Sequence, residues 1–246
     1  MKRIVMLLAA LVVAAAPIYS QKQNSLKFDT KELMLPFALI GIGAVGSQID
    51  AVKELDFGLR GDHASVKGGF VPEDAVQYAP VAAFYGLNMC GVKSAHSISD
   101  GTALALTSYC ITAAATLAIK GVVDEWRPNG VDADAFPSGH AAISFMGAEL
   151  LRLEYRDSAP WAGYAGYAAA LYTSLARIKH TEHWFHDLVA GAGVGILGTR
   201  AAYWVCPRIH NCLFGKKSVK QDKGFTFVGM PLYNGSVKGV SLAMVF

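Results

Sequence analysis

Residues 101–119 read GTALALTSYCITAAATLAI, a stretch without a charged side chain that ends at Lys120. An apolar helix of about 20 residues is long enough to cross the hydrocarbon core of a bilayer. Further uncharged stretches occur at 33–49, 75–92, 135–148, 158–176 and 188–199, the last continuing after Arg200 through 201–207. We therefore predict an all-α fold, a polytopic membrane bundle of about five to six helices. A soluble protein with a buried helical core is the alternative.

The composition supports the membrane interpretation. The chain has 246 residues, of which 53% are hydrophobic and only 17% charged, and its formal net charge is +3. In an ordinary soluble domain about a quarter of the residues are charged. A disordered chain is far less hydrophobic and a nucleic-acid-binding protein needs a basic stripe, so neither class fits and no nucleic-acid partner is expected. The apolar stretches are rich in Ala, Gly and Ser, which let helices approach closely in lipid.

The N-terminal segment has the pattern of a secretory signal peptide over residues 1–20. Two basic residues precede the apolar run 4–18, and polar residues follow it. An uncleaved first membrane helix is the alternative. Residues 21–74 are then predicted to form an interfacial helix over 33–49 and a periplasmic loop near the entrance of the site.

The C-terminal segment differs from the helical part. After a membrane-embedded helical core over residues 75–206, we expect residues 207–246 to form a polar linker and a short β-hairpin. Asn234-Gly235 is a strong signal for a two-residue hairpin turn, and runs that suit strands flank it on both sides.

Three short polar clusters stand at the ends of the apolar stretches. They are Lys120 and, after six intervening residues, Arg127-Pro128; Pro137-Ser138-Gly139-His140; and Arg177, His183 and Asp187, with five and three residues between them. The clusters fall at the end of one predicted helix, the start of the next, the end of the third and the start of the fourth. These four consecutive helices are antiparallel to their neighbours. All four of these ends lie on the same face of a bundle, so we predict that the clusters meet at one edge.

The residue types in these clusters suit a tetrahedral oxyanion. Arginine presents a planar fork that matches phosphate oxygens, and lysine adds a point charge. Ser138 and Gly139 are predicted at a helix N-terminus, where free backbone N–H groups attract anions. His183 and Asp187 lie one helical turn apart, which is the arrangement of a nucleophile and an orienting carboxylate. His140 supplies a second imidazole, suited to protonating a leaving alcohol.

In order and separation, the three clusters resemble the signature of the type 2 phosphatidic acid phosphatase family, which also includes bacterial class A acid phosphatases and vanadium haloperoxidases. The resemblance implies that His183 attacks phosphorus to form a phosphohistidine, that Asp187 orients it and that His140 protonates the leaving oxygen. It also implies that no metal or cofactor is needed, because five protein groups hold the phosphoryl oxygens: Lys120, Arg127, Ser138, Gly139 and Arg177.

Two positions depart from the family pattern. Ala176 stands where a serine usually precedes the third-cluster arginine, which removes one peripheral hydroxyl contact. His186 stands directly before the third-cluster aspartate, where family members often have serine. His180 and His186 therefore compete with His183 for the role of nucleophile. The five-residue spacing and the tryptophan that follows single out His183.

The remaining charges predict which side the site faces. The face opposite the clusters carries Arg152, Arg156, Arg208, Lys216 and Lys217, whereas the cluster face carries Asp124, Glu125, Asp132, Asp134 and Glu182 against Lys179. Cytoplasmic loops favour Lys and Arg. We therefore expect an integral protein of the bacterial cell membrane with its site on the periplasmic side; association with the outer membrane stays open.

The predicted function is that of a phosphoric ester hydrolase acting on a membrane lipid, so the expected partners are a phosphorylated lipid and the membrane. The sequence does not choose among phosphatidate-type glycerolipids, lipid A phosphates and polyprenyl diphosphates. Three alternatives stay open: a soluble-type acid phosphatase of broad specificity, a vanadate-dependent haloperoxidase and a non-catalytic lipid-binding protein. The His183–Asp187 pair argues against the last, because binding alone needs no nucleophile.

Overall fold

The structure, a computed structural model, describes residues 30–49, 52, 71–214, 226–234 and 237–245. The chain divides into two compact units, Met1–Leu213 and Phe214–Phe246. The predicted signal peptide, most of the predicted periplasmic loop and the polar linker at 215–223 lie outside the described residues.

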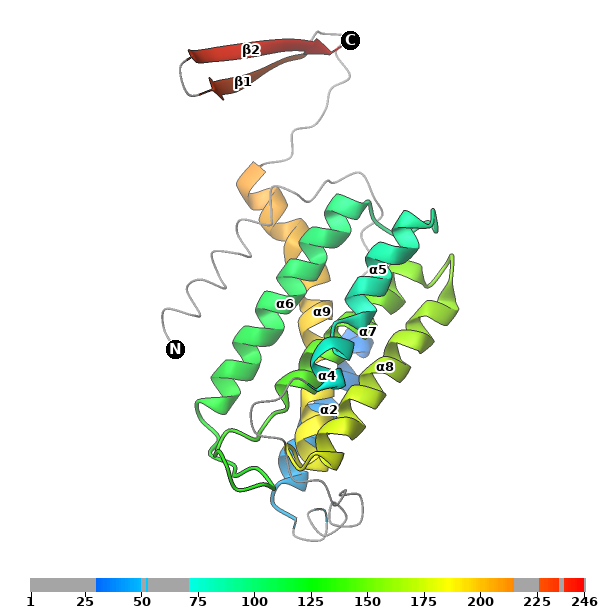
Figure 1. The fold of residues 1–246 in the computed structure, drawn as a ribbon, viewed down its shortest axis with the longest axis vertical. Helices are drawn as coiled ribbons and strands as arrows, with labels where there is room; N and C mark the ends of the chain where they lie inside the picture. The colour runs from blue at the N-terminus through cyan, green and yellow to red at the C-terminus, as the bar shows by residue number, and fades with distance from the viewer. Residues whose placement is uncertain (1–29, 50–51, 53–70, 215–225, 235–236, 246) are drawn as a thin grey trace. The chain divides into compact units, whose positions relative to one another are not determined.

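The described part of the first unit is helical, which confirms the all-α part of the predicted fold. A 3₁₀ turn precedes the α-helices, and the elements, coloured along the chain in Figure 1, are η2 (Thr30–Leu33), α2 (Met34–Gly46), α4 (Pro72–Val76), α5 (Ala79–Met89), α6 (Ile98–Lys120), α7 (Gly139–Tyr155), α8 (Pro160–Lys179) and α9 (Phe185–Phe214). The described residues thus contain seven α-helices, more than the expected five to six.

One apolar stretch is divided, and this division accounts for the extra helix. The stretch 75–92 runs through the end of α4 and all of α5, with a turn at Gln77 and Tyr78 between them. Pro80 lies in the first turn of α5, where its missing N–H is tolerated, whereas it would break a continuous helix. With 11 residues, α5 is about 16 Å long, shorter than the hydrocarbon core of about 30 Å.

Helix α7 is the centre of the bundle, because it packs against α5, α6 and α8, and α9 lies against α6 and α7 through glycines (Figure 1). A methyl group on Gly195 would collide with the carbonyl oxygen of Ala142 in α7, and one on Gly198 would collide with Thr112 in α6. The small residues of the apolar stretches therefore permit close contact between backbones, as expected for helices that pack in lipid.

Two helices are long and apolar enough to cross a membrane by length and composition alone: α6, and residues Phe185–Pro207 of α9. Helix α2, with 13 residues, is about 20 Å long, which is shorter than the hydrocarbon core. The number of spans, and the expectation that residues 33–49 do not cross, stay predictions.

The second unit contains two antiparallel strands, β1 (Thr226–Asn234) and β2 (Val237–Val245). Thr226 pairs with Val245 and Asn234 with Val237. Residues 235–236 lie outside the described part of the chain, so the tight Asn234-Gly235 turn stays a prediction.

Candidate active site

Four helix ends bring the three sequence clusters together. Lys120 ends α6, Ser138 caps the N-terminus of α7, Arg177 lies in the last turn of α8 and Asp187 lies in the first turn of α9. The backbone N–H of Ser138 donates to the backbone carbonyl of Asp187 at 3.1 Å. This bond joins the start of α7 to the start of α9 and places the second cluster against the third.

Acidic residues hold the basic side chains of the site. Nε of Arg127 donates to Oδ1 of Asp134 at 2.9 Å, and its Nη1 donates to Oε2 of Glu182 at 2.5 Å. Glu182 also lies 3.5 Å from Nη2 of Arg177, so one carboxylate bridges the first and third clusters. Lys120 donates to the backbone carbonyl of Asp134. Because like charges repel, these carboxylates stabilise three cations in a small volume.

His183 lies inside this group of cations and is nearly inaccessible to solvent, with 3% of its surface exposed. Burial, followed by the cations Arg127 and Lys120, lowers the pKa of the His183 imidazole well below its ordinary value. The ring is therefore neutral at neutral pH and keeps a free lone pair. Such a ring is a competent nucleophile or base.

Asp187 lies beside the His183 ring. Oδ2 of Asp187 lies 3.5 Å from Nδ1 of His183, and the same oxygen accepts the backbone N–H of Trp184 at 2.8 Å. The 3.5 Å separation is longer than a hydrogen bond, and a shift of about half an ångström would close it. With Nδ1 directed at the carboxylate, Nε2 is the ring atom left to meet a substrate.

The second imidazole of the site is also paired with a carboxylate. Nε2 of His140 lies 2.9 Å from Oδ1 of Asp74, which belongs to the short helix α4. The neighbouring Gly139 has open space on its side-chain side, with no atom within 4 Å of an added Cβ. An anion can therefore approach the backbone at the N-terminus of α7.

The competing histidines have other partners. Nδ1 of His180 lies 2.5 Å from Oε1 of the buried Glu73, and that carboxylate oxygen is 3.8 Å from Nη1 of Arg177. Nε2 of His186 lies 2.8 Å from Oε1 of Glu125 and 3.4 Å from Oδ1 of Asp187. Neither ring has the direct contact with Asp187 Oδ2 that distinguishes His183.

Several acidic residues of the site were not predicted to have a role in it. Glu73 and Asp74 fall in the predicted periplasmic loop, and Asp134 and Glu182 served only to predict sidedness. When a carboxylate pairs with a cation that is distant in the sequence, the two positions have no characteristic spacing. Such a pair cannot be recognised from the sequence. The expectation that the segment before residue 75 lies near the site agrees with the contacts of Glu73 and Asp74.

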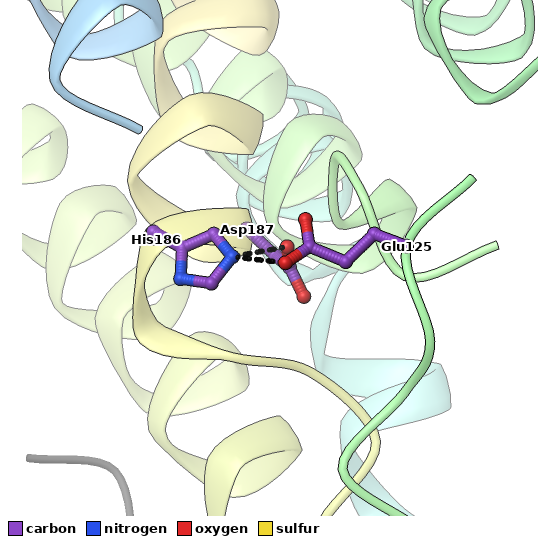
Figure 2. Close-up of side chains that lie close together, drawn as sticks. All are labelled: Glu125, His186 and Asp187. Atoms are coloured by element: carbon purple, nitrogen blue, oxygen red, sulfur yellow. Dashed lines mark hydrogen bonds and ion pairs between the residues drawn. The ribbon is translucent and has the colours of Figure 1, made fainter. Parts of the chain in front are cut away.

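Figure 2 shows the set of side chains that could hold a metal ion. Glu125, His186 and Asp187 each offer one ligand atom, and these atoms lie within 4.8 Å of one another. Nε2 of His186 is 2.8 Å from Glu125 Oε1 and 3.4 Å from Asp187 Oδ1. The shorter distance is that of a hydrogen bond between an imidazole and a carboxylate. This hydrogen bond and the electrostatic attraction between the side chains hold the cluster together.

Comparison with known proteins gives two matches. The family model of the PAP2 superfamily matches residues 101–210. A protein of Porphyromonas gingivalis called lipid A 1-phosphatase is 32% identical over 163 residues, which cover 63% of this chain. The match spans only 34% of that relative's own length. No solved structure matches the chain.

The matched segment contains the helix ends and the loops that build the site. All eight residues predicted from the three clusters fall within residues 101–210, and the structure brings them together around His183. Residues 101–210, which hold the whole candidate site, are thus similar to the PAP2 superfamily, the type 2 phosphatidic acid phosphatases.

Proposed function

We propose that the protein is a metal-independent phosphatase that removes phosphate from a membrane lipid through a phosphohistidine intermediate. The observation that carries this proposal is the buried His183–Asp187 pair (3.5 Å) within a group of three cations. Burial and positive charge keep the imidazole neutral at neutral pH and attract a phosphate to it. Binding alone would not need a neutral, oriented imidazole at this position.

The first step transfers the phosphoryl group to the protein. The lone pair on Nε2 of His183 forms a bond to phosphorus, and the bond from phosphorus to the lipid oxygen breaks. Protonated His140 donates its proton to that oxygen, so the lipid leaves as an alcohol. For a diphosphate substrate it leaves as a monophosphate. Asp187 accepts the Nδ1 proton of His183 in a hydrogen bond and stabilises the charge that develops on the ring.

The second step returns the protein to its starting state. Water attacks the phosphohistidine, His140 accepts a proton from that water, and the bond between phosphorus and Nε2 breaks to release inorganic phosphate. Arg127, Arg177 and Lys120 stabilise the equatorial oxygens in both steps, because their charges are fixed before the reaction begins. Ser138 and Gly139 add the hydroxyl and the backbone N–H groups of the α7 N-terminus.

A lipid phosphate is the substrate class that we propose, and lipid A 1-phosphate is the first candidate. The name of the Porphyromonas gingivalis relative supports it, although phosphatidate-type and polyprenyl phosphates share the same reacting group. The two apolar helices, α6 and Phe185–Pro207, support a location in a bacterial membrane. We place the site on the periplasmic side, because the opposite face carries Arg152 and Arg156.

The proposed organisation of the chain follows from this location. It comprises a signal peptide (1–20), an interfacial helix and loop (21–74), the membrane-embedded phosphatase core (75–206) and a linker with a hairpin (207–246). Only the core carries the proposed chemistry.

The test is phosphate release by the purified full-length protein in detergent, with lipid A, phosphatidate and a polyprenyl diphosphate as separate substrates. The proposal expects turnover of at least one lipid that persists in EDTA and is inhibited by vanadate, whose trigonal-bipyramidal adduct resembles the transition state. Strict dependence on Mg²⁺ or Zn²⁺, or no release from any of the three lipids, contradicts it.

A further inference from the structure

A second imidazole–carboxylate pair lies behind the catalytic one. Asp187 presents Oδ2 to His183 and Oδ1 to Nε2 of His186, at 3.5 and 3.4 Å. Nε2 of His186 is in turn 2.8 Å from Oε1 of Glu125 (Figure 2). Four side chains thus alternate acid and base in one continuous row, from Glu125 in the loop after α6 to His183.

The environment of His186 holds its ring in place. The ring is buried, with 1% of the residue exposed, and it stacks with Trp184 (9° between planes) and with Phe136 (30°). On its backbone side lies Gly46 of α2, where an added Cβ would come within 3.0 Å of the His186 Cβ. A ring confined on three sides can fix the direction of a hydrogen bond.

The proton of the His186 ring belongs on Nε2. Nδ1 is buried and has no hydrogen-bond partner among the described residues, and a buried N–H without an acceptor costs about 1–3 kcal/mol. With the proton on Nε2, the ring donates to Oε1 of Glu125 at 2.8 Å and leaves Nδ1 bare. The same nitrogen lies 3.4 Å from Oδ1 of Asp187, which it contacts without forming a hydrogen bond.

We propose that His186 and Glu125 are positioning residues that hold the Asp187 carboxylate in the orientation that directs the His183 ring at phosphorus. This inference rests on the proposed function. The backbone N–H of Trp184 restrains only Oδ2 of Asp187. Without the His186 ring in contact with Oδ1, at 3.4 Å, the carboxylate is free to rotate, and its alignment with His183 is lost. A serine at position 186 is too short to reach Glu125 in this way.

The protein contains a matched control for the loss of a buried His–carboxylate pair. Nδ1 of His96 lies 2.8 Å from Oε1 of Glu154, and both residues are as buried as His186, at 3% and 1%. His96 precedes α6 and Glu154 lies near the end of α7, at the ends of these helices opposite to the site. Replacing His96 therefore tests the cost to stability without touching the proposed row.

The experiment compares His186→Leu, His186→Gln and His96→Leu in the full-length protein in detergent, with the lipid that the wild type hydrolyses fastest. Glutamine keeps an N–H donor near the position of Nε2, whereas leucine removes it. We expect His186→Leu to lower kcat about 10- to 100-fold, the usual loss when a supporting partner is removed, with KM within about threefold. His186→Gln should recover kcat to within about threefold of the wild type, and His96→Leu should lower the unfolding temperature but keep kcat.

Two results would overturn the inference: wild-type kcat in folded His186→Leu, or a kcat for His186→Gln as low as that of the leucine variant. If His186→Leu does not fold, Glu125→Gln replaces it, and an unchanged kcat there overturns the role of Glu125. Failure of the proposed function itself is visible separately, because the wild-type protein would then release no phosphate.

Discussion

At each end of the α6–α7 pair, a buried histidine lies 2.8 Å from a carboxylate: His96 and Glu154 at the end far from the site, and His186 and Glu125 at the site end. The two ends differ in how many of the surrounding buried polar atoms have a hydrogen-bond partner. At the far end, Glu154 contacts the His96 ring, accepts the His96 backbone N–H at 3.0 Å and accepts the hydroxyl of Tyr203. At the site end, Nδ1 of His183, Oδ1 of Asp187 and Nε of Arg177 are buried without a hydrogen bond to the described residues.

This difference separates a structural polar cluster from one arranged for chemistry. Leaving a buried polar atom without a hydrogen bond costs about 1–3 kcal/mol, and native proteins leave few such atoms. His183, His186, Asp187 and Arg177 carry such atoms, and all four lie in or beside the site. The far end gains stability from its network, whereas the site end leaves buried polar atoms that, under the proposed function, are available to a phosphate.

The largest expected effect removes the proposed nucleophile. His183→Ala should lower the rate of phosphate release by at least about 1,000-fold, because no other group supplies the covalent step. The protein should remain folded, since Nδ1 of His183 makes no hydrogen bond to the described residues. His180→Ala is the matched control and should keep most of the activity. Full activity in His183→Ala would refute the assignment, and an inactive, unphosphorylated His180→Ala would transfer it to His180.

At the far end, around His96 and Glu154, we expect a substitution to lower stability and to leave activity unchanged. Glu154→Ala leaves the His96 ring and the Tyr203 hydroxyl without their shared acceptor. We expect the free energy of unfolding to fall by about 3 kcal/mol or more, measured by thermal or denaturant unfolding in detergent, while kcat of the folded fraction stays within about twofold of the wild type. A large loss of kcat at unchanged stability would erase the distinction between the two ends.

A smaller effect concerns pH. The pKa of His183 is lowered by burial and by the nearby cations, so the ring stays neutral and reactive as the pH falls through about 6.5, where an ordinary histidine would be half protonated. The acid limb of kcat/KM, which reports the free enzyme, should therefore lie clearly below pH 6.5. An acid limb centred at or above pH 6.5 would mean that a different group, or an unperturbed histidine, carries the reaction.

The smallest effect is a difference in labelling that shows which end faces outward. In a variant without native cysteines, Asp132→Cys near the site should react with a membrane-impermeant thiol reagent in intact spheroplasts. Asp157→Cys, in the loop between α7 and α8, should be protected. The opposite result would place the site on the cytoplasmic side and remove exported lipids as substrates.

The sequence predicts the site because its clusters lie at helix ends. Lys120, Ser138, Arg177 and Asp187 each mark where a helix begins or ends, and antiparallel helices bring alternate ends together. Spacing also picks out His183, since Asp187 follows four residues later, although α9 begins only at Phe185 and His183 lies in the loop before it. These signals are local, and they are therefore readable without coordinates.

The parts that sequence did not predict depend on contacts between distant segments. Asp74 meets His140 across 66 residues and Glu125 meets His186 across 61, and neither pair has a characteristic spacing. The division of the stretch 75–92 into two helices was missed for a different reason. An apolar stretch reads as continuous although Pro80 begins a new helix within it.

The most direct test of the central claim is to trap the phosphorylated protein. The wild-type protein, mixed with a ³²P-labelled lipid phosphate and quenched within milliseconds to seconds, should carry label that is lost in acid and kept in base, as expected for a phosphohistidine. Mass spectrometry of the peptide should place the phosphate on His183, and His183→Ala should carry none while His180→Ala and His186→Gln still do. Label on another residue, or turnover with no trapped phosphohistidine at any quench time in an active preparation, would contradict the account.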